Sequence, residues 1–244
     1  MKRVIVIQAR MTSTRLPGKV LMDVCGRPML AQQLRRLKRC RRVDEIVLAT
    51  TGNAADDPVV ALADGEGVRW FRGSEDDVLS RYAEAAREAQ AGLIVRVTSD
   101  CPLIDPEVTD RVIAALEERA AECDYAANVI RRTFPQGLDT EAFFIDTLER
   151  VHRMAASRPA REHVTLFIYR ERPDLFAVHS VVDGEDHSDI RWTVDTAEDL
   201  ALVRRVYEEL ELGERDLTYR DILGHVLASP DLVDMNRHIV QRDV

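Results

Sequence analysis

The chain has 244 residues, of which 45% are hydrophobic and 32% charged, and its formal net charge is −9. This balance is typical of a soluble globular protein with a sizeable core, and the acidic excess argues against nucleic acid as a partner. The apolar runs are too short to span a bilayer and no signal peptide is visible, so we expect a cytoplasmic protein that does not bind membranes. Four widely spaced cysteines without a Cys-x-x-Cys pair predict reduced thiols rather than a zinc site.

The N-terminal stretch carries the strongest pattern in the chain. The β-branched run 4–7 predicts a buried strand, and residues 8–19 combine small and hydroxyl side chains with Arg10, Arg15 and Lys19. A loop at the carboxyl end of a first strand is where open α/β sheets bind ligands, and small residues let its backbone approach a phosphate. We therefore expect a nucleoside triphosphate site here. The alternative is a basic turn that binds nothing.

Lysine is rare in this chain. Only three of the 34 basic residues are lysines, and they stand at positions 2, 19 and 38. A chain that uses arginine almost everywhere still has lysine at position 19, which favours a compact, rotatable ammonium there over a planar guanidinium. The basic cluster 35–42 is better explained as a solvated helix end than as a surface for an anionic partner.

Strands and helices alternate through the first half. Periodicity and capping signals predict strands at 45–50, 68–71 and 93–97, and helices at 28–38, 57–66, 78–89 and 106–116. Right-handed crossovers join such strands into a parallel sheet. We therefore expect the α/β class, with a mostly parallel central sheet flanked by helices and a Rossmann-like plan.

The pattern becomes irregular after residue 124. It predicts strands at 125–130, 141–145, 176–182 and 190–194, and helices at 146–154, 161–170, from Thr196 onward, and at 219–227. We expect the strand-rich section 125–189 to extend the sheet and to cover the ligand cleft. Its apolar strands offer an interface for a homodimer.

Two aspartates end predicted strands in the same way. Asp100 follows the strand at 93–97, and Asp195 follows the strand at 190–194. Both carboxylates should lie at the same sheet edge as the loop 8–19. A bound triphosphate needs a cation such as Mg²⁺ to neutralise its charge, and Mg²⁺ takes one or two carboxylates together with phosphate oxygens. The pair predicts a magnesium site, although each aspartate alone is also explained as a local helix cap.

The opening loop resembles that of a known family. Residues 8–10 (Gln-Ala-Arg) and 13–19 (Ser-Thr-Arg-Leu-Pro-Gly-Lys) are similar to the sugar-activating cytidylyltransferases, which include the CMP-KDO and CMP-sialic acid synthetases. Gln8 and the segments 133–141 and 161–165 are most similar to the SpsF-like branch. The resemblance implies one nucleotidyltransferase domain over 1–244, of the nucleotide-diphospho-sugar transferase-like fold. Its nucleotide-binding half would be 1–124, its acceptor-binding and dimerisation section 125–189, and its return strand and C-terminal helices 190–244.

The resemblance also implies a set of site residues. The catalytic set would be Arg10, Arg15, Lys19, Asp100 and Asp195, with Mg²⁺ held by the two aspartates. The nucleotide would contact Ala9, Arg10, Ser13, Arg15, Lys19, Gly73, Ser74 and Asp100. The acceptor pocket would contain Gln136, Asp139, Glu141, Arg161 and His163, although a purely structural role for His163 is equally open. Family members often have glycine where this chain has Ser99, which makes that loop less permissive.

The activity that the resemblance implies is Mg²⁺-dependent transfer of CMP from CTP to a sugar acid, such as a nonulosonic acid or KDO. Pyrophosphate would be released, and the product would serve as a precursor of surface polysaccharides. One alternative is a glycosyltransferase that consumes a nucleotide sugar, but such enzymes usually hold their metal with Asp-x-Asp, which this sequence lacks. The other is a nucleotide-binding subunit without catalysis, which the presence of Lys19, Asp100 and Asp195 argues against.

Overall fold

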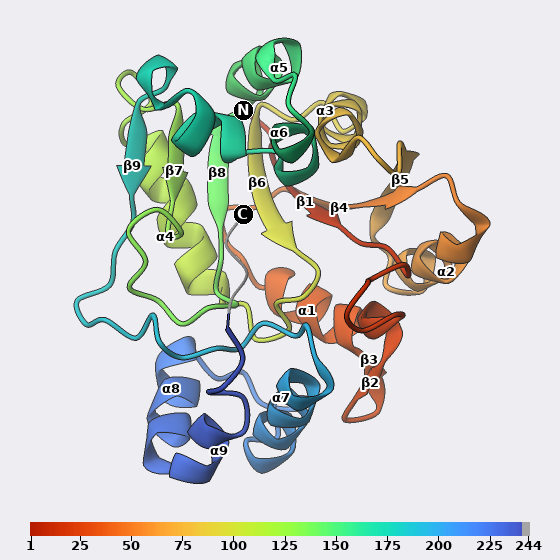
Figure 1. Ribbon diagram of the computed structural model, residues 1–244, viewed down its shortest axis with the longest axis vertical. Helices are drawn as coiled ribbons and strands as arrows, with labels where there is room; N and C mark the ends of the chain where they lie inside the picture. The colour runs from red at the N-terminus through yellow and green to blue at the C-terminus, as the bar shows by residue number, and fades with distance from the viewer. Residues whose placement is uncertain (241–244) are drawn as a thin grey trace.

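A computed structural model describes residues 1–240, which contain a seven-stranded sheet in the order β5-β4-β1-β6-β8-β7-β9 (Figure 1). Only β8 runs against its neighbours, because it pairs antiparallel with β6 and β7 while the other pairs of this sheet are parallel. The predicted α/β class with a mostly parallel sheet is thus confirmed. The strands are β1 (Arg3–Gln8), β4 (Glu45–Thr51), β5 (Arg69–Gly73), β6 (Leu93–Thr98), β7 (Tyr125–Ala127), β8 (Glu141–Phe144) and β9 (Val178–Ser180).

Helices cover both faces of the sheet. Side chains alternate between the faces of β1, so Val4 and Val6 pack under one helical layer while Ile5 and Ile7 pack under the other. This is why an uninterrupted apolar strand is buried on both sides. One layer consists of α3 (Val78–Glu88), α5 (Ile145–Met154) and α6 (Arg158–His163). The other consists of α1 (Met29–Leu37), α2 (Asp57–Gly65) and α4 (Pro106–Glu117).

The C-terminal helices form a third cluster, drawn in blue at the bottom of Figure 1. They are α7 (Ala197–Glu209), α8 (Tyr219–Ala228) and α9 (Pro230–Asp234). As predicted, Thr196 caps α7, and its hydroxyl accepts from the backbone N–H of Asp199 in a capping box. Fully buried Trp192 packs into this cluster. Within residues 1–240, no helix has the length and apolarity needed to cross a membrane.

The predicted strand at 190–194 is wrong. Its apolar side chains pack into the third cluster, and its backbone bonds to loops instead of a strand: the N–H of Trp192 donates to the Gln136 oxygen at 2.7 Å, and that of Val194 to the Asp100 oxygen at 2.8 Å. Among the described residues, a single parallel bridge, between Gln136 and Arg191, resembles sheet pairing. The alternation of apolar and polar residues that predicted a strand therefore reflects the burial of one side of an extended segment that is not a sheet strand.

The predicted helix at 161–170 is also wrong in its extent. The helix α6 ends at His163, because Val164 takes φ 53° and ψ −62°, and the N–H of Thr165 bonds back to the His163 oxygen at 2.5 Å. A π-helical turn, η3 (Phe167–Glu171), follows. The strands β7 and β9 are each three residues long, shorter than predicted. The homodimer expected through the section 125–189 stays a prediction.

Candidate active site

Most of the predicted site residues line a pocket of about 360 Å³. Its walls come from the loop after β1, the first turn of α3, the end of β6 and the segment before α7. The predicted residues that line it are Ala9, Arg10, Ser13, Arg15, Lys19, Asp100, Asp139, His163 and Asp195. The carboxyl ends of β1 and β6, which are neighbours in the sheet, thus contribute to one cavity, as expected for an open α/β sheet.

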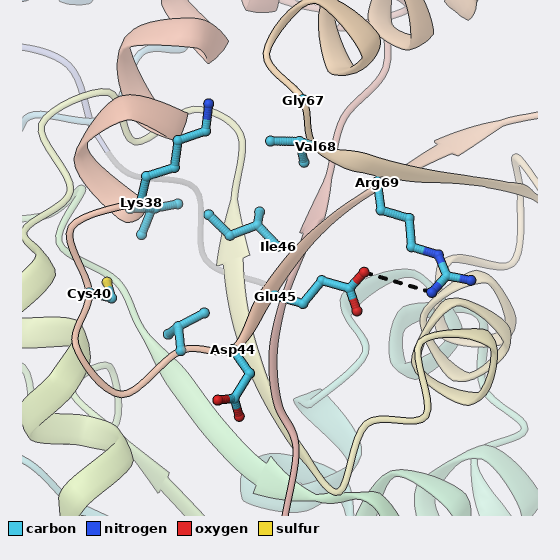
Figure 2. Close-up of a pocket in the computed structure, with 10 residues that line it drawn as sticks. Lys38, Cys40, Asp44, Glu45, Ile46, Gly67, Val68 and Arg69 are labelled. Carbon is cyan, nitrogen blue, oxygen red and sulfur yellow. Dashed lines mark ion pairs between the residues drawn. The ribbon is translucent and has the colours of Figure 1, made fainter.

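Another hollow, of about 310 Å³, lies where β4 and β5 begin (Figure 2). Its charged side chains are already partnered: Glu45 lies 3.7 Å from Arg69, and Lys38 bonds to Glu66 at 2.9 Å. None of the predicted site residues lines it. We therefore treat the pocket at the end of β1 as the candidate active site.

Lys19 is the centre of one end of this pocket. Gly18 adopts a left-handed conformation, φ 73°, and directs the chain into the short 3-10 helix η1 (Lys19–Leu21), which leaves Lys19 only 8% exposed. Its Nζ donates to the Val194 carbonyl at 2.7 Å and to Asp195 Oδ1 at 2.9 Å, and it lies 3.6 Å from Asp100 Oδ2. The opening loop and both strand-end carboxylates thus meet at one ammonium group.

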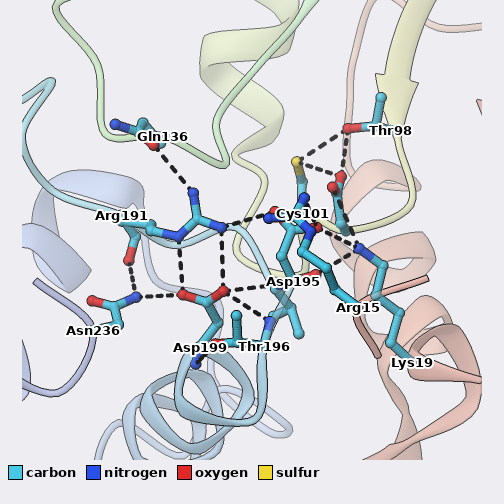
Figure 3. Close-up of polar contacts among 12 residues, drawn as sticks. Arg15, Lys19, Thr98, Cys101, Gln136, Arg191, Asp195, Thr196, Asp199 and Asn236 are labelled. Atoms are coloured by element: carbon cyan, nitrogen blue, oxygen red, sulfur yellow. Dashed lines mark hydrogen bonds and ion pairs between the residues drawn. The ribbon is translucent and has the colours of Figure 1, made fainter. Parts of the chain in front are cut away.

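The two aspartates are held differently. The Thr98 hydroxyl donates to Asp100 Oδ1 at 2.6 Å, which leaves Oδ2 toward Lys19. Asp195 is 5% exposed and also forms an ion pair with Arg15, at 2.9 Å (Figure 3). Burial opposes ionisation of Asp195, but Lys19 and the neighbouring arginines outweigh it and lower the pKa of this carboxyl. Asp195 is therefore an anion that can hold cations.

Arg191 anchors Asp195 from behind, and sequence reasoning missed it. Its guanidinium bonds to Asp195 Oδ2 at 2.8 Å and to Asp199 Oδ1 at 3.0 Å, and Asn236 also donates to Asp199 Oδ1, at 2.8 Å (Figure 3). Asp199 accepts from the backbone N–H groups of Asp195 and Thr196 as well. The available signal was an arginine inside the apolar run 190–194, where a charge requires a buried partner.

The pocket wall contains another arginine that the sequence did not single out. Arg81, on α3, lines the pocket and is 2% exposed. Burial lowers the pKa of its guanidinium, and nearby Arg10 adds to this effect. One terminal nitrogen donates to the Ser74 carbonyl. Predicted residues Gly73 and Ser74 therefore lie behind Arg81 rather than on the pocket wall.

The five predicted acceptor residues are divided by the structure. Asp139 and His163 line the pocket. Glu141 lies beneath it and binds Arg96, which does line it, while Gln136 contacts Arg191 and the Ser188 carbonyl.

Arg161 points elsewhere, since its Nε bonds to Asp77 at 3.0 Å. Asp139 itself forms a bidentate pair with Arg132, at 2.5 and 2.9 Å. The desolvation of His163 lowers the pKa of its imidazole. A neutral ring able to accept a proton thus faces the cavity.

Comparison with known proteins identifies the family. A family model described as cytidylyltransferase matches residues 4–219. This chain is a cytidylyltransferase family member.

An uncharacterized protein of Methanocaldococcus jannaschii is 35% identical over 99% of this chain and 97% of its own length. The spore coat polysaccharide biosynthesis protein SpsF of Bacillus subtilis is 32% identical over 93% and 94%. A 3-deoxy-manno-octulosonate cytidylyltransferase of Geobacter sulfurreducens is 41% identical over 48% of this chain and 46% of its own. A solved cytidylyltransferase from Leptospira borgpetersenii superposes with a TM-score of 0.91 at 30% identity, covering all of both chains. The predicted family and the nucleotidyltransferase class are confirmed.

The cytidylyltransferase pocket has a donor set that fits a divalent cation. Asp100 and Asp195 both direct a carboxylate oxygen at Lys19 Nζ, so a position between them already attracts positive charge. Carboxylate oxygens are ligands that Mg²⁺ accepts, and one or two of them suffice when phosphate oxygens complete the shell. Among residues 1–240, no three metal-ligating side chains gather at one point. These two carboxylates therefore fit a metal ion that binds together with the nucleotide, whose phosphate oxygens complete its shell.

Proposed function

We propose that this chain transfers CMP from CTP to a hydroxyl group of a sugar acid, of the nonulosonic acid or KDO type, with Mg²⁺ as its metal. The observation that carries the proposal is the convergence of Arg15, Lys19, Asp100 and Asp195 at one end of the pocket. The similarity to SpsF and to a 3-deoxy-manno-octulosonate cytidylyltransferase supports the sugar-acid acceptor and a role in surface glycan precursors.

The base and the triphosphate of the bound nucleotide would contact different residues of the pocket. Its base would lie near Ala9 and Arg10, on the side of Gly73 and Ser74. Its β- and γ-phosphates would take the cations of Arg15 and Lys19, which bind Asp195 in the protein alone. When the nucleotide binds, its phosphates would replace Asp195 as the anionic partner of these cations. The cations could then bind the substrate without being left as unpaired buried charges.

In the reaction, the acceptor hydroxyl attacks the α-phosphorus of CTP. A new P–O bond to the acceptor forms, the bond between the α-phosphorus and the oxygen bridging to the β-phosphate breaks, and pyrophosphate leaves. Arg15 and Lys19 stabilise the charge that develops on the leaving group, and Asp100 and Asp195 would hold the metal. Bound Mg²⁺ supplies charge neutralisation on the phosphate oxygens.

The acceptor would occupy the part of the pocket lined by Asp139 and His163. The neutral His163 imidazole can accept the hydroxyl proton, and Asp139 can accept a hydrogen bond from a second hydroxyl. Behind them, Glu141 would support the wall through Arg96, and Gln136 would do so through Arg191. Arg161 would act farther away, by fixing Asp77 at the start of α3.

The proposal can be tested by following pyrophosphate release from CTP with a panel of sugar acids, with and without Mg²⁺. Asp100→Asn should lower acceptor-dependent release by about a hundredfold or more, because the site loses a charged ligand that would hold the metal at the α-phosphate. Asp174→Asn, at an exposed carboxylate outside the pocket, is the control and should leave the rate unchanged.

Intact release in Asp100→Asn or Asp100→Ala would refute the assignment of the site. Transfer from a UDP- or CMP-sugar without use of CTP would favour the glycosyltransferase alternative. Nucleotide binding without turnover over the whole panel would favour a binding subunit. Family membership supports cytidylyl transfer over both of these.

A further inference from the structure

A tight turn follows the helix α6, directly after the pocket residue His163. Its centre is Val164, at φ 53° and ψ −62°, and the N–H of Thr165 donates back to the His163 carbonyl at 2.5 Å. This is the geometry of the γ-turn with positive φ, which is rare and strained. A β-branched residue is sterically disfavoured there, so the turn persists only where surrounding contacts fix it.

The three residues of the turn have different surroundings. His163 lines the active-site pocket, and Val164 is buried in the core cluster that includes α3. Thr165 is also buried, and its side chain bonds to Glu141 beneath the pocket. The turn therefore decides where the imidazole lies relative to the two buried residues that follow it.

On one side, a hydroxyl group clamps the turn to the sheet. Thr165 is 1% exposed, and its hydroxyl donates to Glu141 Oε2 at 2.5 Å. Glu141 belongs to β8 and lies in register with Arg96 of β6, whose guanidinium also bonds to it. The hydroxyl is thus attached, through one carboxylate, to two neighbouring strands.

On the other side, the helix α6 is held by Arg161. Its Nε bonds to Asp77 at the start of α3, and its Nη1 donates to the His152 carbonyl at 2.9 Å. The helix packs beside α3 (Figure 1). With Arg161 fixed before His163 and Thr165 fixed after it, the backbone between them has little freedom to relax the strain.

We propose that Thr165 is a positioning residue, whose hydroxyl holds the His163 imidazole in the pocket through the strained turn at Val164. The inference rests on the proposed acceptor site, in which His163 takes the hydroxyl proton. Proton transfer requires the two heavy atoms to lie within hydrogen-bond distance, so a ring displaced by about 1 Å loses much of its effect. Without the clamp, the turn can relax and the ring can move toward solvent.

The charges around the imidazole lie outside residues 164 and 165. Burial is the main cause of its lowered pKa, Arg96 lowers the pKa further, and Glu162 on its own helix opposes the shift. Asp139 and Arg81 of α3 also line this pocket. A substitution at position 165 leaves all of these charges in place, so a change in the pKa would report a displaced ring.

The first test measures the imidazole without turnover, by an NMR titration of histidine-labelled protein in which His163→Gln assigns the signal. Thr165→Val keeps the shape of the side chain but removes the donor, so we expect the pKa of His163 to rise toward its usual 6.5 as the ring gains water. Thr165→Ser keeps the donor and should keep the lowered pKa. A lowered pKa preserved in Thr165→Val would overturn the inference.

Thr147→Val is the matched control. Thr147 is a buried threonine of α5 outside the pocket, and its hydroxyl has no hydrogen-bond partner among the described residues. The same substitution there should leave the pKa of His163 unchanged. An equal shift in both variants would overturn the inference, because loss of any buried hydroxyl would then suffice.

The second test follows acceptor-dependent pyrophosphate release. Thr165→Val should lower kcat about tenfold or more and move the acid limb of kcat/KM toward pH 6.5, while the Kd for CTP stays within about twofold. Retained CTP binding also shows that the variant is folded, and Thr165→Ser should restore both kinetic values. A variant that loses stability but keeps the acid limb would overturn the inference. Absence of turnover in the unchanged protein would instead overturn the proposed function, and the NMR titration would still decide the inference.

The strain at Val164 is tested separately by urea denaturation. Glycine adopts positive φ freely whereas alanine does not, so Val164→Gly should unfold at a urea concentration no lower than Val164→Ala. At Val151, a buried position within α5, glycine should be the less stable of the two, as is usual in a helix. A lower midpoint for Val164→Gly than for Val164→Ala would contradict the strained turn and overturn the inference.

Discussion

The ammonium group of Lys19 lies 2.9 Å from Asp195 Oδ1, although 176 residues separate the two in the chain. The same group lies 3.6 Å from Asp100 Oδ2. A triphosphate that draws Lys19 away leaves two carboxylates with less positive charge between them, and a divalent cation restores the balance. Nucleotide and metal should therefore bind cooperatively at this point.

Replacing Lys19 by arginine tests whether any cation suffices. Lys19 is 8% exposed and its Nζ fits among three oxygen atoms, where a planar guanidinium has no room. We expect Lys19→Arg to raise the Kd for CTP with Mg²⁺ by about tenfold or more, ~1.4 kcal/mol, in calorimetric titrations. The control is Lys38→Arg, at a lysine outside this pocket. An unchanged Kd for Lys19→Arg would show that only the charge matters.

Removing Arg191 should destabilise the protein, because buried Asp199 loses its cationic partner and Asp195 keeps only Lys19 and Arg15. The side chains of Arg191, Asp195 and Asp199 are 4%, 6% and 0% exposed. We expect Arg191→Met to lower the free energy of unfolding by about 3 kcal/mol in urea denaturation. Arg87→Gln, which breaks a partly exposed ion pair, should cost less than about 1 kcal/mol. Equal losses in the two variants would contradict a special role for the buried network.

Glu141→Gln tests the wall beneath the acceptor region. Glu141 accepts from Arg96, from the Tyr125 hydroxyl at 2.7 Å and from the Thr165 hydroxyl at 2.5 Å. The amide would leave Arg96 buried without a counter-charge, so we expect a loss of about 3 kcal/mol of stability in urea denaturation. Glu149→Gln, at a more exposed ion pair, is the control. A loss in Glu141→Gln no larger than in this control would show that the pair is dispensable.

The pH dependence of acceptor use should report His163. Burial lowers the pKa of this imidazole below its usual 6.5, and Arg96 lowers it further while Glu162 opposes the shift. The ring is therefore neutral at pH 7, and kcat/KM for the acceptor should fall only as pH drops through the lowered pKa. The same shift makes the stability contribution of His163 complete above pH 6.5 and lost as pH falls through its folded pKa.

The measurement is a profile of kcat/KM for the acceptor between pH 5 and pH 9. His163→Gln should lack the acid limb that the unchanged protein shows. The Kd for CTP provides the control, since it should not follow His163 over this range. An identical acid limb in His163→Gln would show that another group is responsible for the fall in kcat/KM at low pH.

Local patterns predicted the nucleotide half of the fold well. The run 4–7 forms β1, because four consecutive β-branched residues favour a strand that is buried on both faces. The same reasoning failed at 190–194, where apolar alternation reflects packing against α7–α9 rather than strand pairing. It failed again after His163, where the backbone of Val164 breaks the helical spacing.

By itself the sequence determined the α/β class, the opening loop and the two strand-end aspartates, because hydrophobic period and capping are local properties of the chain. The tertiary structure decided which charges meet. Arg191 and Arg81 became visible only through their buried surroundings, and Arg161 was drawn away to Asp77. Such pairings depend on how distant segments pack, since a charge takes the nearest partner that remains once water is excluded.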